Sequence, residues 1–164
     1  MSKPFARPLP ALALLLIALA AFAPSASAKI VLGKSVAGVA LGDKGSEVRA
    51  VLGKPPRVVK YSGGQSWYYK HESPAHWVTL TSKARVVGLE TDSTAQRTKR
   101  GIGPGSSLEQ FKAAYPRAKC HTTTVGPRVC SLFTKVKQRR IRSGFVFFDG
   151  KCGLVDVGRI GEFG

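Results

Sequence analysis

The sequence is poor in acidic side chains and in cysteine. It has 9 Asp and Glu residues against 26 Lys and Arg residues, and 3 cysteines among 164 residues. So few cysteines exclude a small scaffold held together by many disulfides, and the length is enough for one compact domain that folds without a metal. The formal charge of +17 favours polyanionic partners such as nucleic acid, anionic lipid head groups or cell-wall polymers, or an acidic protein.

The only long apolar run in the sequence lies within the first 28 residues. Lys3 and Arg7 precede the apolar stretch 9–23, and Ala26 and Ala28 have the spacing of a signal-peptidase cleavage site. The stretch is shorter than the roughly 20 residues that a membrane-spanning helix needs. We therefore predict an export signal that is removed, and a secreted or periplasmic protein with no transmembrane segment. Its removal lowers the formal charge from +17 to +15.

The sequence contains no catalytic or metal-binding motif with the spacing that its chemistry requires. His71 and His76 resemble the two histidines of a zinc-protease helix, but they are five residues apart with Pro74 between them, and that site needs four. Glu90 and Asp92 would share one face of a strand, which permits a glycosidase-type pair, although solvated partners for nearby cations are the simpler interpretation. We predict a non-enzymatic protein with no catalytic residue, no metal and no cofactor.

Two segments, 42–53 and 105–116, align without a gap at an offset of 63 residues. In each, apolar side chains recur at i, i+3 and i+4, which predicts one buried face of a short helix. Ser106 and Glu109 have the spacing of a capping box. Such short helices are unstable alone, so each must pack against other elements. The matched apolar positions are Val48, Val51 and Leu52 with Phe111, Ala114 and Tyr115.

Segments typical of antiparallel strands follow each predicted helix, separated by turn signals such as Gly63-Gly64, Gly126-Pro127 and Asp149-Gly150. We predict an α+β fold of two tandem helix-plus-antiparallel-hairpin repeats, with one helix layer on a roughly eight-stranded antiparallel sheet. The predicted divisions are a signal peptide at 1–28, a first repeat at 29–92, a linker at 93–103 and a second repeat at 104–164.

The phrases around the two predicted helices resemble a known family. Val39-Ala-Leu-Gly42 and Val51-Leu-Gly-Lys-Pro55 in the first half, and Gly101-Ile-Gly-Pro-Gly105 and Ala114-Tyr-Pro116 in the second, are similar to the tandem modules of the beta-lactamase inhibitory protein-like fold. They are also similar to the single module of the SmpA/OmlA (BamE) outer-membrane assembly lipoproteins, although the lipidated cysteine is missing here. The resemblance implies a tandem α/β scaffold that makes protein contacts through aromatic side chains on an uncovered sheet face.

The cysteines predict one disulfide. Cys120 and Cys130 flank the predicted Gly126-Pro127 hairpin turn, so they can sit opposite one another on adjacent strands at a separation that a disulfide tolerates. An exported protein favours this bridge, with a Cys130 to Cys152 pairing as the alternative. A free Cys152 would be either a reactive thiol or, more simply, a small buried apolar residue.

The candidate binding residues are basic or aromatic. The cation-rich segment 135–142 is a predicted hairpin tip, where strand alternation would place Lys135, Lys137 and Arg139 on one side. Trp67 and Tyr69 alternate with Tyr68, so one set should face the helices and the other the open side of the sheet. The predicted partner-binding residues are Trp67, Tyr68, Tyr69, Trp77, Lys135, Lys137, Arg139, Arg140 and Arg142.

Together these features predict an exported, non-enzymatic binding module. It would contact a protein or envelope component through the open sheet face and the basic hairpin. The alternative is a polyanion binder for anionic lipid, cell-wall polymer or nucleic acid, whose binding would weaken steeply with salt. Export makes intracellular nucleic acid the weaker of these partners.

Overall fold

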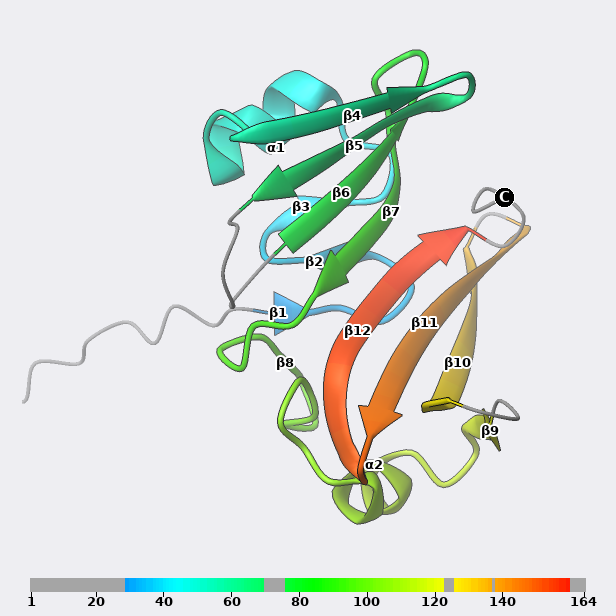
Figure 1. The fold of residues 1–164 in the computed structure, drawn as a ribbon. Coiled ribbons are helices and arrows are strands. Elements are labelled where there is room, and N and C mark those ends of the chain that lie inside the picture. The colour runs from blue at the N-terminus through cyan, green and yellow to red at the C-terminus, as the bar shows by residue number, and fades with distance from the viewer. Residues whose placement is uncertain (1–28, 70–75, 123–125, 137, 160–164) are drawn as a thin grey trace, which may run out of the picture.

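A computed structural model describes residues 29–69, 76–122, 126–136 and 138–159 (Figure 1), and the predicted signal peptide lies outside them. Eight strands make one sheet: β4 (Arg57–Tyr61), β5 (Gly64–Tyr69), β6 (His76–Thr81), β7 (Val86–Thr91), β9 (Lys119–Thr122), β10 (Arg128–Val136), β11 (Arg139–Phe148) and β12 (Lys151–Arg159). Four two-residue strands and two helices make up the other elements of the described residues: β1 (Lys29–Ile30), β2 (Ser35–Val36), β3 (Val39–Ala40), β8 (Arg97–Thr98), α1 (Gly45–Leu52) and α2 (Leu108–Ala114).

The large sheet consists of two meanders joined at its centre. The first meander is β4–β7 and the second is β9–β12. Its strand order is β4-β5-β6-β7-β12-β11-β10-β9, and all neighbouring pairs are antiparallel. Each meander uses short local connections, whereas β7 and β12 are brought together from distant parts of the sequence. Leu89 lies opposite Val157 and Thr91 opposite Val155 in this central pair.

The predicted α+β class of two tandem helix-plus-hairpin repeats is wrong. The structure is mostly β: 55% of the described residues are in strands and 13% in helices, because α1 has only 8 residues and α2 only 7. Short extended segments take up chain that the prediction assigned to the helical parts and the linker. β8 lies within the predicted linker and pairs in parallel with β1, with Lys29 opposite Arg97 and Ile30 opposite Thr98.

The capping of α2 also differs from the prediction by one residue. The Ser107 hydroxyl accepts a hydrogen bond from the Gln110 N–H at 3.1 Å, and Gln110 Oε1 accepts one from the Ser107 N–H at 2.8 Å. Ser106, the predicted cap, is buried, and its hydroxyl accepts from the Gly103 N–H at 3.1 Å. The preceding glycine-rich turn therefore uses Ser106, and the next serine caps the helix.

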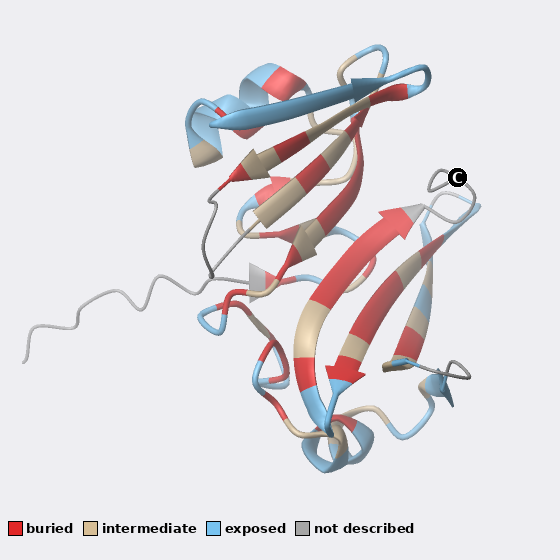
Figure 2. Cartoon of the chain, viewed as in Figure 1, coloured by how far each residue is buried: buried red, intermediate tan, exposed pale blue. Residues whose placement is uncertain are grey.

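The hydrophobic core lies between one face of the sheet and the helices together with the N-terminal strands. Val48 of α1 and Phe111 of α2 are both fully buried, and the Phe111 ring centroid lies 4.8 Å from that of Phe145. Val51, predicted to share the buried face of α1, is instead 51% exposed. Buried residues line β7, β11 and β12 in Figure 2.

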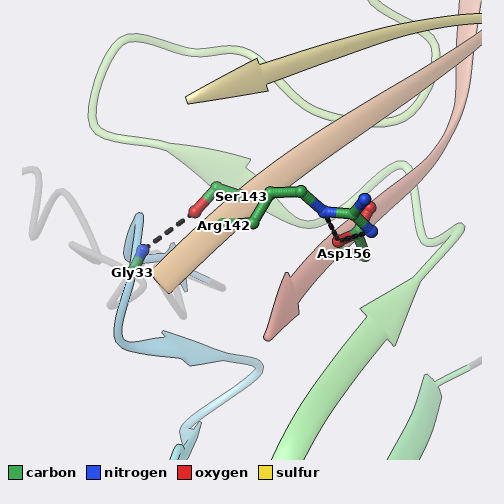
Figure 3. A network of polar contacts seen from close by, with 4 residues as sticks. All are labelled: Gly33, Arg142, Ser143 and Asp156. Atoms are coloured by element: carbon green, nitrogen blue, oxygen red, sulfur yellow. Dashed lines mark hydrogen bonds and ion pairs between the residues drawn. The ribbon is translucent and has the colours of Figure 1, made fainter. Parts of the chain in front are cut away.

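The segment between β1 and β2 is hydrogen-bonded to the second meander. The Gly33 N–H donates to the Ser143 hydroxyl at 2.9 Å, a buried hydrogen bond between residues 110 positions apart (Figure 3). A Cβ on Gly33 would lie 2.7 Å from Thr134 Cβ, so only glycine permits this approach. The N-terminal segment therefore covers the core side of the sheet and leaves the other side to face solvent.

Candidate functional site on the open face of the sheet

One row of side chains crosses the face of the sheet that points away from the core, here called the open face. Arg57 lies opposite Tyr68, Tyr68 opposite Trp77, Trp77 opposite Glu90, and Glu90 opposite Asp156. Directly opposed residues share a face, with Cβ atoms about 5 Å apart. Five strands thus bring a cation, two aromatic rings and two carboxyl groups into one line.

Asp156 is held by an arginine on the neighbouring strand. Arg142 Nη2 lies 3.0 Å and Nε 3.3 Å from Asp156 Oδ1. Figure 3 draws these contacts between the two side chains. Gly144 lies opposite Asp156, and a Cβ at this glycine would lie 2.0 Å from Asp156 Oδ2. The missing side chain at Gly144 therefore provides the space in which the carboxylate sits.

The two central carboxyl groups hold their protons more strongly than usual. Burial, and then the negative charge of Asp156, raise the pKa of Glu90, while Arg142 lowers it. Burial also raises the pKa of Asp156, and this effect is partly offset by the charge and hydrogen bond of Arg142 and by a backbone hydrogen bond from Gly144. The centre of the open face is therefore an acidic spot in a strongly basic protein.

The sequence permits a pair of Glu90 with Asp92, although solvated carboxylates are the simpler interpretation; in the structure Glu90 lies opposite Asp156 instead. β7 ends at Thr91, so Asp92 lies beyond the strand and outside the row. The sequence does carry a signal for Asp156, because it interrupts the apolar segment Leu154-Val-Asp-Val157. A carboxylate inside an apolar strand requires a partner, and the partner is Arg142.

The aromatic candidates divide between the two faces of β5. Trp67 is 2% exposed and Tyr69 is 7% exposed, and both belong to the core. This moves them off the candidate contact surface, because strand alternation turns them toward the helices. Tyr68 and Trp77 remain on the open face and are partly exposed. The Arg57 guanidinium carbon lies 5.4 Å from the Tyr68 ring centroid, a cation–π contact at the end of the row.

The basic hairpin is formed by β10 and β11. Lys135 lies opposite Arg140 and Val136 opposite Arg139, so Lys135 and Arg139 point to opposite faces. The prediction that these two share a side is wrong. Side chains alternate between the two faces along a strand, but the hairpin turn interrupts this alternation between Lys135 and Arg139. Lys137 lies outside the described residues.

Lys135 and Arg140 extend the open face along the hairpin. Arg140 places its guanidinium carbon 4.5 Å from the ring centroid of Phe133, which is 41% exposed. Phe133 in turn lies opposite Arg142, the partner of Asp156. The basic hairpin and the central acidic row are therefore parts of one continuous surface.

The predicted disulfide between Cys120 and Cys130 is confirmed. It links the short outer strand β9, whose four residues are all exposed, to β10. Cys152 is free and buried, which excludes the alternative pairing. Burial raises the pKa of the Cys152 thiol to about 12, and its Sγ donates to the Leu154 carbonyl at 3.4 Å.

His76 lies in β6 and is partly buried, whereas His71 falls in a stretch that the structure does not describe. Within the described ranges, no group of three or more His, Cys, Asp or Glu side chains could hold a metal ion. Neither α1 nor α2, the helices of the described part, has the length and apolar content that crossing a membrane requires.

Comparisons with known proteins support the fold alone. No protein-family model and no curated protein matches the chain. An extracellular protein containing an SCP domain from Bacillus anthracis strain Ames has a TM-score of 0.54 and 12% identity, over 73% of this chain and 44% of that one. A DUF4309 family protein (YjgB) from Bacillus subtilis strain 168 has a TM-score of 0.54 and 13% identity, over 77% of this chain and 88% of that one.

These two structures are similar to this chain in architecture, at identities too low to carry function. The chain spans less than half of the SCP-containing protein. Neither neighbour is described as a beta-lactamase inhibitory protein or a BamE-type lipoprotein, and that resemblance stays a prediction.

Proposed function

We propose that this protein is an exported, non-enzymatic binding module that contacts a protein or envelope component through the open face and the basic hairpin. The observation that carries the proposal is the cross-strand row from Arg57 to Asp156. Aromatic and arginine side chains contribute most of the binding energy at protein interfaces. Here Tyr68 and Trp77 lie side by side on rigid strands, where little entropy is lost on binding.

Export rests on three features. Residues 1–28 have the composition of a secretory signal. The Cys120–Cys130 disulfide is typical of an oxidising compartment. One structural neighbour is an extracellular protein. Together they favour a secreted or periplasmic location for this chain.

The test is capture of a partner from an envelope or culture-fluid fraction by the purified protein and by variants. We expect a partner retained by the wild type and lost from Tyr68→Ala/Trp77→Ala. Val51→Ala, which removes exposed apolar surface from α1 on the other side of the sheet, is the matched control and should retain it. Equal retention by all three proteins would contradict a contact through the open face.

Binding to polyanions is the second candidate function. The 26 basic side chains outnumber the 9 acidic ones, so most cations have no acidic residue to pair with. Lys135 and Arg140 are opposite one another on the basic hairpin, where like charges repel unless an anion lies between them. Binding to DNA or anionic vesicles should weaken steeply as salt rises. Salt-insensitive binding, or none, would rule this function out.

A further inference from the structure

A pocket of about 340 Å³ lies at the start of α1, on the core side of the first meander. Four of its lining residues are cations: Lys44 and Arg49 come from the start and the body of α1, and Lys83 and Arg85 come from the turn between β6 and β7. All four side chains are exposed. The pocket is thus open to solvent and positively charged.

Two of these cations lie at directly opposed backbone positions. Lys44 and Arg85 form an antiparallel bridge, so their side chains start from opposed positions. Like charges in directly opposed positions are destabilising. The Arg85 guanidinium also donates to the Gly42 carbonyl at 3.1 Å, which keeps it close to this bridge. An anion between these side chains would remove the repulsion.

The N-terminus of α1 adds a further positive electrostatic potential to the pocket. A helix N-terminus carries a partial positive charge from its unpaired N–H groups. Glu47 is the acidic side chain of this first turn, and its Oε2 already accepts the Lys44 N–H. Glu47 therefore offsets one of the four cationic charges.

Trp67, which lines the same pocket, carries a buried donor without a partner. Trp67 is 2% exposed, and its Nε1 is buried without a hydrogen-bond partner. A Cβ on Gly45, the first residue of α1, would lie 2.8 Å from Trp67 Cη2 and 3.4 Å from Cζ2. Nε1 is two bonds from Cζ2, so the donor is near the start of α1. Buried donors in proteins almost always have a partner, and leaving one unpaired is costly.

We propose that this pocket binds a phosphoryl group. A phosphoryl group carries up to two negative charges and several acceptor oxygens, which suits three or more converging cations better than a single carboxylate does. One oxygen would accept from Trp67 Nε1–H, and the others would pair with Lys44, Lys83 and Arg85. Arg49 now lies with its guanidinium carbon 4.8 Å from the Trp67 ring centroid. Its exposed side chain moves off the ring to admit the ligand.

This site is separate from the surface of the proposed function. Trp67 faces the core side of the sheet, whereas Tyr68 and Trp77 lie on the open face. The basic hairpin belongs to the other meander. Failure of one proposal therefore leaves the other unaffected.

The test uses the purified protein in which Trp77→Phe leaves Trp67 as the sole tryptophan. Inorganic phosphate is titrated at constant ionic strength, and Trp67 fluorescence is recorded. We expect a saturable change in emission. Titration calorimetry of the wild type with phosphate gives a second measurement that does not depend on the tryptophan substitution.

Two double variants that remove the same charge distinguish phosphate binding at this pocket from a general attraction to the net positive charge of the protein. Lys44→Gln/Lys83→Gln should weaken phosphate binding by about tenfold or more, since each removes a charged hydrogen bond. Lys99→Gln/Lys112→Gln removes the same charge from exposed positions after β8 and on α2, and should change the affinity by less than about twofold. Equal loss in both variants, or no saturable binding in either measurement, would overturn the proposal.

The same titration identifies the source of the phosphoryl group. Glycerol phosphate and vesicles containing phosphatidylglycerol replace inorganic phosphate in parallel experiments. Binding of inorganic phosphate and glycerol phosphate but not of vesicles points to a soluble ligand. Tighter binding of the vesicles, still lost in Lys44→Gln/Lys83→Gln, points to a lipid head group.

Discussion

Glu90 and Asp156 lie directly opposite one another across the central pair of strands, β7 and β12. Residues that far apart in the sequence meet only because the two meanders join at this seam. The pair places two carboxyl groups with raised pKa values in the middle of the open face, with Arg142 bound to one of them. Stability should therefore depend on pH through these groups.

Glu90→Gln should stabilise the protein at neutral pH. The folded-state pKa of Glu90 lies above its ordinary value of 4.5, so ionising the carboxyl costs folding free energy. That cost is absent below the unfolded-state pKa and is fully present above the folded-state pKa. Denaturant unfolding should show a gain at pH 7 that disappears as the pH falls to about 4. The exposed Glu109→Gln on α2 is the control and should give no such gain. A variant equally destabilised at both pH values would contradict the prediction.

Gly144→Ala should destabilise the protein. The new Cβ would lie 2.0 Å from Asp156 Oδ2, so the carboxylate must move and its contact with Arg142 must change. We expect a loss of about 1–3 kcal/mol in the free energy of unfolding. Gly63→Ala is the matched control, because a Cβ there meets nothing within 4 Å. Equal effects of the two substitutions would show that the close approach at Gly144 is unimportant.

Cys152 should resist alkylation in the folded protein. Its thiol is buried, and burial raises its pKa to about 12, so almost no thiolate exists at pH 8. Iodoacetamide treatment followed by mass spectrometry should show no adduct in native buffer and one adduct in denaturant without reductant. Cys152→Ala should show none in either condition. An adduct on the native protein would mean that the thiol is accessible.

Removing the disulfide should destabilise the protein and loosen β9. The bridge closes a loop between residues 10 positions apart, for which loop entropy gives about 2.5 kcal/mol. Cys120→Ala/Cys130→Ala should lose about that amount, and amide exchange should accelerate most in Lys119–Thr122. Reduction of the wild type gives the same loss if the covalent link is responsible. A loss in the variant without one on reduction would instead implicate the buried Cys130 side chain.

Local signals in the sequence predict the features that depend on local chemistry. Gly63-Gly64 and Asp149-Gly150 lie at turns between strands, and Cys120 pairs with Cys130 across a hairpin. Val48 and Phe111, matched by the internal alignment, are both buried. The turns and the disulfide depend on residues that are close together in the sequence. The buried helix positions follow from the helical spacing of apolar residues in each segment.

The features that were missed depend on distant contacts. Nothing near Glu90 in the sequence indicates that Asp156 will lie opposite it, and nothing near Arg97 indicates a parallel pair with Lys29. The fold class was wrong because α1 and α2 are shorter than the predicted segments 42–53 and 105–116, and because short strands such as β8 occupy chain outside the predicted hairpins. In the basic hairpin, the turn between β10 and β11 sets the register of the two strands, and the register decides on which face of the sheet each cation lies. The amino-acid composition of the segment does not determine that register.

The outer strand β4 shows how the charge affects assembly of this protein. All five of its residues are exposed, and among the described strands only β5 pairs with it, so one row of backbone groups lies at the rim of the sheet. Such a rim invites a strand from another molecule and so promotes aggregation. Arg57 and Lys60 lie on this strand, and a second copy would bring the same charge toward them. Electrostatic repulsion between copies therefore protects the rim, and that protection would weaken as salt screens the charges.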